Sequence, residues 1–167
     1  QRAVYFSNIL GVDMGMFYKR RDYSTVVNGR NPIVAHEFLG DSVEGKDVIV
    51  IDDMISSGES MLEVCSKLKG LKAGRIFVCT TFGLFCNGLE VFDEAYKNGT
   101  FYRVFTTNGV YQTPELLSRD WYESVDLSKY TAYFLDTLNH DMSVSSLLDC
   151  SDKIEKILIK KGLKEEK

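Results

Sequence analysis

The chain alternates between short apolar runs and longer segments in which apolar residues recur every three or four positions. The short runs predict strands, at residues 14–18, 33–39, 48–51, 76–80 and 102–106. The periodic segments predict helices, at residues 2–10, from about 58 to 70, 89–97, 128–139 and from 152 onward. Strands that alternate with helices in this way indicate an α/β domain with a mostly parallel sheet flanked by helices.

Residues 48–51 form the clearest strand. All four are Val or Ile, a composition typical of a strand covered on both faces. Met61, Cys65 and Leu68 then share one face of the helix that we expect to begin near Gly58.

The pattern is weaker in the last third of the chain. Residues 107–126 show no clear period and are expected to be irregular, with Trp121 at a domain edge or an interface. Ser128 is placed to cap the following helix, in which the spacing of Tyr130, Tyr133 and Phe134 predicts a core-facing side. We expect one domain over residues 1–150 and a charged helical tail over 151–167.

Composition narrows the class of protein. Of 167 residues, 44% are hydrophobic and 26% charged, which is ordinary for a globular chain with a real core. A net charge of −4 argues against nucleic acid as the main partner, and no apolar run approaches the roughly 20 residues that cross a membrane. The four cysteines lack the spacing of a zinc site or a disulfide framework, so we expect a reducing, cytoplasmic protein.

The most informative segment, residues 48–60, is a strand, an acidic pair, a turn of small residues and a helix start. Ligands of open α/β sheets bind where strands end, and here the strand delivers Asp52 and Asp53. The small residues after them let backbone N–H groups approach a phosphate, with the positive helix end behind. Carboxylates repel phosphate, so the pair must face sugar hydroxyls or a magnesium ion.

A purely structural interpretation of this segment is also available. The acidic pair alone is compatible with a simple turn, and Ser57 with a helix cap that accepts from first-turn amides. The complete run of thirteen residues favours a ligand with a phosphate at one end and a diol at the other.

Residues 52–60 resemble the phosphoribosyl diphosphate loop of type I phosphoribosyltransferases, a fold shared by ribose-phosphate pyrophosphokinases. The resemblance implies that Asp52 and Asp53 bind the ribose 2- and 3-hydroxyls. It also implies that the turn wraps the 5-phosphate, through Ser56, Ser57, Gly58, Glu59 and Ser60. Ser56 stands where many members have Asp, which leaves phosphate contact as its expected role, and Ser57 stands where many have Thr.

Residues 17–22 carry a second resemblance. Lys19, Arg20 and Arg21 open a polar stretch that we expect to form an exposed loop to residue 30. Charge runs are usually solvated surface, but this one resembles the segment that ribose-phosphate pyrophosphokinases place over the ATP phosphates. By that resemblance Lys19 and Arg21 are catalytic and stabilise the transferring diphosphoryl group.

The resemblance therefore implies the C-terminal half of a ribose-phosphate diphosphokinase, an enzyme that uses ATP and ribose 5-phosphate with Mg²⁺ and forms homo-oligomers. The family's N-terminal domain and first strand have no counterpart here, so we expect the 167 residues alone to be inactive. A phosphoribosyltransferase would need a base-recognition hood, which the sequence does not reveal. A non-catalytic regulatory subunit that senses ribose phosphate is the other alternative.

Overall fold

The computed structural model describes the backbone of residues 2–21 and 33–164, and the side chains of 2–18 and 37–164. The strands are β1 (Met16–Arg21), β2 (Ile33–Leu39), β3 (Val48–Ile55), β4 (Ile76–Gly83), β5 (Arg103–Thr107) and β6 (Tyr122–Val125). The helices are α1 (Arg2–Leu10), α2 (Glu59–Gly70), α3 (Glu90–Lys97), α4 (Pro114–Leu117), α5 (Ser128–Asn139), α6 (Ser145–Leu148) and α7 (Ser151–Lys160).

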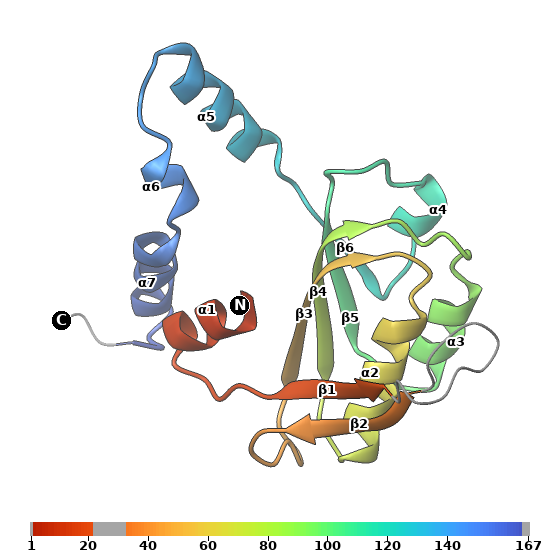
Figure 1. The fold of residues 1–167 in the computed structure, drawn as a ribbon. Helices are drawn as coiled ribbons and strands as arrows, with labels where there is room; N and C mark the ends of the chain where they lie inside the picture. The colour runs from red at the N-terminus through yellow and green to blue at the C-terminus, as the bar shows by residue number, and fades with distance from the viewer. Residues whose placement is uncertain (1, 22–32, 165–167) are drawn as a thin grey trace.

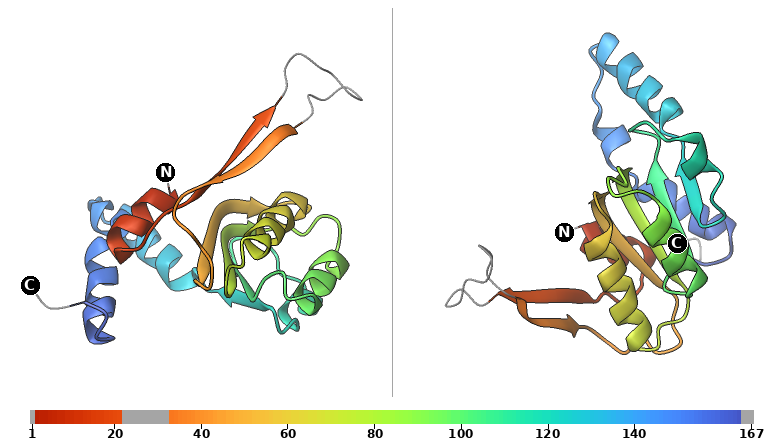
Figure 2. Two further views of the ribbon diagram at one scale, coloured as in Figure 1. Left: turned by 90° about the horizontal axis from the view of Figure 1, so that it is seen from below. Right: turned by 90° about the vertical axis from the view of Figure 1, so that its right-hand side faces the viewer.

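The centre of the fold is a four-stranded sheet in the order β3-β4-β5-β6, and each neighbouring pair is parallel. Helices α2, α3 and α4 cover one face of this sheet, whereas α1 and α5–α7 lie on the other side (Figures 1 and 2). The core fills the layer beneath α2 and α3, where Ile76, Val78 and Val104 are fully buried. The predicted α/β class with a mostly parallel sheet is confirmed.

The prediction that residues 48–51 are covered on both faces is wrong. Ile49 is 54% exposed, and Val48, Val50 and Ile51 are only half-buried. Strand β3 lies at one end of the sheet order, and α2 and α3 cover only one face. The strand also continues to Ile55, so it includes the acidic pair.

Strands β1 and β2 form a separate antiparallel ribbon that projects away from the main sheet (Figure 2). Phe17 pairs with Phe38, and their rings lie 5.3 Å apart. The loop expected from Lys19 begins later, because β1 runs through Arg21. The rest of that predicted loop, residues 22–32, lies outside the described residues.

The stretch 107–126, expected to be irregular, contains α4 and β6. Strand β6 is short and three of its four residues are exposed, so it has no apolar run to reveal it. Trp121, just before it, belongs to the core rather than to an edge: it is 2% exposed and stacks on Phe92 at a centroid distance of 5.5 Å.

Helices α5, α6 and α7 form an arm that leaves the sheet after β6 (Figure 1). Throughout these three helices, all of them described, no residue is fully buried, so the predicted core role of Tyr130, Tyr133 and Phe134 is wrong. Tyr130 and Phe134 contact each other instead, and Tyr133 is exposed. In place of the expected Ser128 cap, Asp126 accepts from the backbone N–H and the hydroxyl of Ser128, at 2.9 and 2.6 Å.

The far end of the arm contacts the first helix. Helix α7 lies beside α1, and the hydroxyls of Tyr5 and Ser151 are 3.4 Å apart. Within the ranges 2–21 and 33–164, none of the helices combines the length and the apolarity needed to cross a membrane. The domain boundary expected at residue 150 stays a prediction.

Candidate functional site

The acidic pair lies near the carboxyl end of β3, where the sequence predicts a ligand. Both Asp52 and Asp53 are exposed. The Asp52 carboxylate accepts from the Asp53 amide and the Asp53 carboxylate accepts from the Met54 amide, both at 2.9 Å. The hydrogen bond between the two carboxyl groups and the Met54 amide lower the pKa of Asp53 below its ordinary value. Asp53 is therefore a charged acceptor at neutral pH, suited to a sugar hydroxyl.

The turn after β3 presents the start of α2 without a side-chain cap. Gly58 occupies the N-cap position in a left-handed conformation, with φ +90°, and no side chain caps the helix there. The first amides of a helix have no intrahelical partner, and together with the helix dipole they attract anions. This arrangement fits a phosphate on the turn that begins at Ser56 and Ser57 and continues through Glu59 and Ser60.

Backbone hydrogen bonds from the segment after β4 hold this turn in place. The Leu84 and Cys86 amides donate to the carbonyl oxygens of Ile55 and Ser56, at 2.8 and 2.9 Å. The Ser56 hydroxyl donates to the Cys86 sulfur at 3.8 Å. A phosphate contact by Ser56 stays a prediction, and no local sequence pattern reveals the contact with Cys86, which lies thirty positions away.

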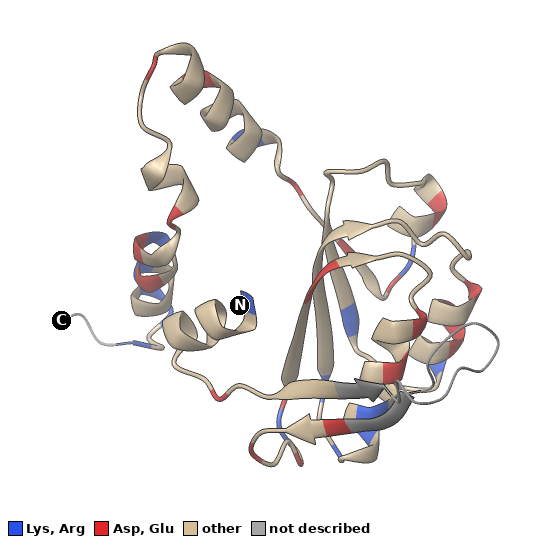
Figure 3. Ribbon diagram, in the orientation of Figure 1, with Lys and Arg blue, Asp and Glu red and all other residues tan. Residues whose placement is uncertain are grey.

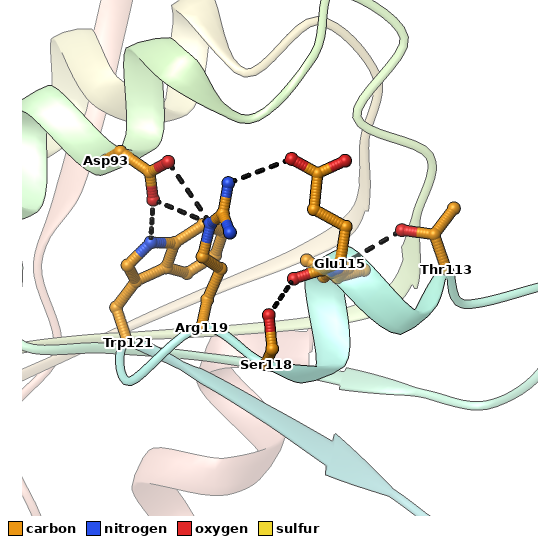
Figure 4. A network of polar contacts seen from close by, with 7 residues as sticks. Asp93, Thr113, Glu115, Ser118, Arg119 and Trp121 are labelled. Atoms are coloured by element: carbon orange, nitrogen blue, oxygen red, sulfur yellow. Dashed lines mark hydrogen bonds and ion pairs between the residues drawn. The ribbon is translucent and has the colours of Figure 1, made fainter.

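An aromatic cluster supports Gly58 from below. A Cβ atom on Gly58 would lie 2.3 Å from the ring of Phe92, which is fully buried. Trp121 stacks on that ring and donates its indole N–H to Asp93 at 2.7 Å (Figure 4). Arg119 also donates to Asp93, at 3.1 Å. The candidate turn therefore rests on a cluster fixed by half-buried polar contacts, none of which local sequence spacing reveals.

Two cavities can be compared with this site. One of about 200 Å³ adjoins the segment after β4, and its lining combines apolar residues such as Leu84 and Leu89 with the acidic residues Glu90 and Glu115. A larger one of about 410 Å³ lies between α1 and the α6–α7 part of the arm, beside Tyr5. None of the predicted site residues lines the larger cavity, so the volume of a cavity does not identify the candidate site here.

The two predicted catalytic residues are placed only by their backbone. Lys19 and Arg21 lie in β1, on the projecting ribbon, and their side chains lie outside the described residues. Of the predicted site residues, those whose side chains the structure describes are Asp52, Asp53 and the turn residues, and they lie on one continuous segment.

Magnesium would have to be held together with a substrate. The side chains of residues 2–18 and 37–164 offer no group of three or more His, Cys, Asp or Glu that could hold a metal ion. The carboxyl groups of Asp52 and Asp53 lie close to each other, but two carboxylates alone do not complete the coordination shell of a magnesium ion. Mg²⁺ commonly binds through one or two carboxylates plus substrate phosphates and waters, and a single carboxylate of the pair fits that mode.

The fold and this segment define a class: α/β domains that hold a phosphorylated ligand where a parallel strand turns into a helix. A family model described as the phosphoribosyl transferase domain matches residues 1–118. The chain belongs to this family.

Curated relatives refine the picture. A ribose-phosphate pyrophosphokinase from Vibrio parahaemolyticus is 26% identical over 149 residues, which are 89% of this chain and 44% of the relative. One from Pyrococcus furiosus is 34% identical over 88 residues, 53% of this chain and 29% of the relative. The predicted resemblance to ribose-phosphate pyrophosphokinases is confirmed, and the chain spans less than half the length of these relatives.

A solved structure supports the fold. Phosphoribosylpyrophosphate synthetase from Mycobacterium smegmatis superposes with a TM-score of 0.55 and 16% identity, over 64% of this chain and 34% of that one. The likeness confirms the phosphoribosyltransferase-like fold.

Proposed function

We propose that this chain is the ribose-5-phosphate-binding part of a ribose-phosphate diphosphokinase. The observation that carries the proposal is the geometry of β3 and the turn after it: exposed carboxylates next to an uncapped helix start. Sugar hydroxyls suit the carboxylates and a phosphate suits the helix start. Ribose 5-phosphate carries both groups on one small molecule.

The reaction transfers the β,γ-diphosphoryl group of ATP to ribose 5-phosphate. The 1-hydroxyl oxygen forms a bond to the β-phosphorus, the bond from that phosphorus to the α-phosphate oxygen breaks, and AMP leaves. The hydroxyl proton passes to solvent, and the products are phosphoribosyl diphosphate and AMP. Asp52 and Asp53 orient the ribose by its 2- and 3-hydroxyls, so that the 1-hydroxyl is held ready for attack.

Lys19 and Arg21 supply positive charge to the transferring group. Phosphoryl transfer is catalysed mainly by positioning and by cations on the charge-bearing oxygens, which matches their residue types. Mg²⁺, when bound with the phosphates, adds charge neutralisation. The relatives are more than twice as long as the matched stretch, so we infer that the remaining ATP contacts lie outside these 167 residues. We also infer a reducing, cytoplasmic compartment, since all four cysteines are free. The family resemblance is the ground on which we infer a homo-oligomer.

Titration calorimetry with ribose 5-phosphate tests the binding site. The 167-residue chain should bind ribose 5-phosphate more tightly than ribose or inorganic phosphate. Asp53→Asn should weaken ribose 5-phosphate binding roughly 10- to 100-fold, because it removes a charge-assisted hydrogen bond, while binding of inorganic phosphate stays unchanged. Asp152→Asn, a matched change on α7, should leave both affinities alone. Equal affinities of wild type and Asp53→Asn would overturn the assignment.

Turnover tests the catalytic role of the basic ribbon. The chain alone should release no AMP from ATP. In the whole protein, Lys19→Ala should collapse AMP release while the affinity for ribose 5-phosphate is kept, because the lysine acts on the transferring group. An unchanged rate would remove Lys19 from the mechanism. A whole protein that binds ribose 5-phosphate but never releases AMP would instead indicate a regulatory subunit.

A further inference from the structure

Phe85, in the segment between β4 and α3, has a strained backbone conformation. Its φ is +47°, in the left-handed region that bulky side chains rarely adopt. Such a conformation costs free energy and persists only where the surrounding contacts impose it. Strained residues of this kind are often found at binding sites, and Phe85 lies directly beside the candidate turn.

The side chain of Phe85 is held by the aromatic cluster. Its ring lies 5.0 Å from the ring of Phe92 and 6.0 Å from those of Trp121 and Tyr122, measured between centroids, and the residue is buried. Gly83 leaves room for this ring, because a Cβ atom at that position would lie 2.6 Å from it. The cluster therefore fixes the ring, and the fixed ring holds the backbone on either side of it.

The backbone on both sides of Phe85 bonds to the candidate turn. The amides of its two neighbours, Leu84 and Cys86, donate to consecutive carbonyl oxygens, those of Ile55 and Ser56. The donors are two positions apart and the acceptors only one, so Phe85 is the extra residue of an irregular pairing. A β-bulge accommodates an extra residue in a similar way, and bulges are common next to active sites. The left-handed conformation of Phe85 thus lets both amides reach the turn.

These hydrogen bonds set the direction of two peptide groups. A peptide unit is planar and trans, so its N–H points away from its own carbonyl oxygen. Because the carbonyl groups of Ile55 and Ser56 are held toward the segment after β4, the N–H groups of Ser56 and Ser57 point away from that segment. Neither of these N–H groups donates to another described residue. Successive N–H groups directed to one side form a concavity that binds anions.

The side chains of these two segments add one contact and no positive charge. The Ser56 hydroxyl donates to the Sγ atom of Cys86 at 3.8 Å. Sulfur is a weak acceptor, so this contact orients the hydroxyl and still lets it turn to a phosphate. Residues 54–58 and 84–89 include neither Lys nor Arg (Figure 3), so these segments offer a phosphate hydrogen-bond donors only. The phosphate affinity that they provide therefore depends on how accurately the donors are aimed.

We propose that Phe85 is a positioning residue of the ribose-phosphate site. Its fixed ring holds the amides of Leu84 and Cys86, and these amides aim the N–H groups of the turn at the 5-phosphate. The Cys86 side chain assists by orienting the Ser56 hydroxyl. This role rests on the proposed function and assigns to it residues that touch no substrate. Loss of either contact should weaken the binding of the phosphate and leave the binding of the sugar hydroxyls, which belongs to the acidic pair, unchanged.

NMR titration of the isotope-labelled chain with ribose 5-phosphate and with ribose tests this role, because the ratio of the two affinities reports the contribution of the phosphate. Phe85→Ala should lower the affinity for ribose 5-phosphate roughly 10- to 100-fold and leave the affinity for ribose unchanged. Ile76→Ala is the matched control, since Ile76 is a fully buried residue of the same core at the opposite end of β4. It should lower the stability and keep the ratio.

Cys86 provides a second pair of variants that leaves the core intact, because this residue is exposed. Cys86→Ala removes the acceptor of the Ser56 hydroxyl and should lower the affinity for ribose 5-phosphate about 2- to 10-fold. Cys86→Ser supplies another acceptor and should restore that affinity. If Phe85→Ala does not fold, an unchanged affinity of Cys86→Ala is enough to overturn the positioning role.

The outcomes for the wild type separate this role from the proposed function. A wild type that binds ribose 5-phosphate no more tightly than ribose would overturn both. A wild type that prefers ribose 5-phosphate, with the same preference in Phe85→Ala, would overturn the positioning role alone. The expected result is a preference that falls in Phe85→Ala and in Cys86→Ala, and that stays at the wild-type level in Ile76→Ala and in Cys86→Ser.

Discussion

At the scale of single residues, Gly58 is the most constrained position of the candidate site. Its φ of +90° lies in the left-handed region, and a Cβ atom would overlap the Phe92 ring. A turn with close backbone approach could be predicted from the small residues after Asp53, because phosphate-binding turns need such residues. The contacts from Phe92 and Cys86 could not be predicted, since they come from residues about thirty positions away that show no local pattern.

Gly58→Ala should lower the free energy of unfolding by about 1–3 kcal/mol, because the new methyl group meets a buried ring and the backbone is strained. It should also weaken ribose 5-phosphate binding, since relief of the overlap displaces the turn. Urea denaturation and calorimetric titration measure the two effects. Gly70→Ala, at the end of the same helix with open space around it, is the control and should not destabilise the protein. Equal losses at both positions would contradict the steric argument.

At the scale of elements, the hydrophobic pattern predicted the existence of most strands and helices but the observed bounds of only some of them. Strand β2 was predicted at its observed bounds and helix α5 close to them, because each has a clear run or period. Strand β6 was missed, since a short strand with exposed residues is specified by its pairing with β5 rather than by its own sequence. The exposure of Ile49 was also unpredictable, because an apolar run looks the same whether one or both faces of its sheet are covered.

The junction of β6 and α5 is held by one carboxylate. Hydrogen bonds from the Ser128 hydroxyl and N–H and from the Asn108 amide lower the pKa of Asp126. A lowered folded-state pKa means that Asp126 stabilises the fold above its unfolded pKa of about 4. That contribution is lost as pH falls through the folded pKa.

Asp126→Asn should therefore be less stable than wild type at pH 7, and the difference should shrink as pH falls from about 5 to below 3. Urea midpoints at a series of pH values measure it. Asn108→Ala removes one of the donors, so the pH dependence that Asp126 contributes should become smaller in that background. A difference that stays constant across the whole pH series would show that the carboxylate charge is not what holds the junction.

At the scale of the whole molecule, the chain joins two parts with different packing. The sheet with α2–α4 has an aromatic and aliphatic core that includes Phe92 and Trp121. The arm has no such core in any of its three helices. The fold class could be predicted from the alternation of strands and helices. The arm could not, because a helical period indicates an apolar face but not the surface that will cover it.

The order of the strands has a consequence for how the chain acquires its shape. From β4 to β6, each strand pairs with the one that precedes it in the sequence, so every pairing in the main sheet closes a short stretch of chain. Folding rates rise as contacting residues lie closer together in sequence. The sheet can therefore grow one strand at a time as the polypeptide leaves the ribosome, and the aromatic cluster beneath the candidate turn is complete only when Trp121 emerges.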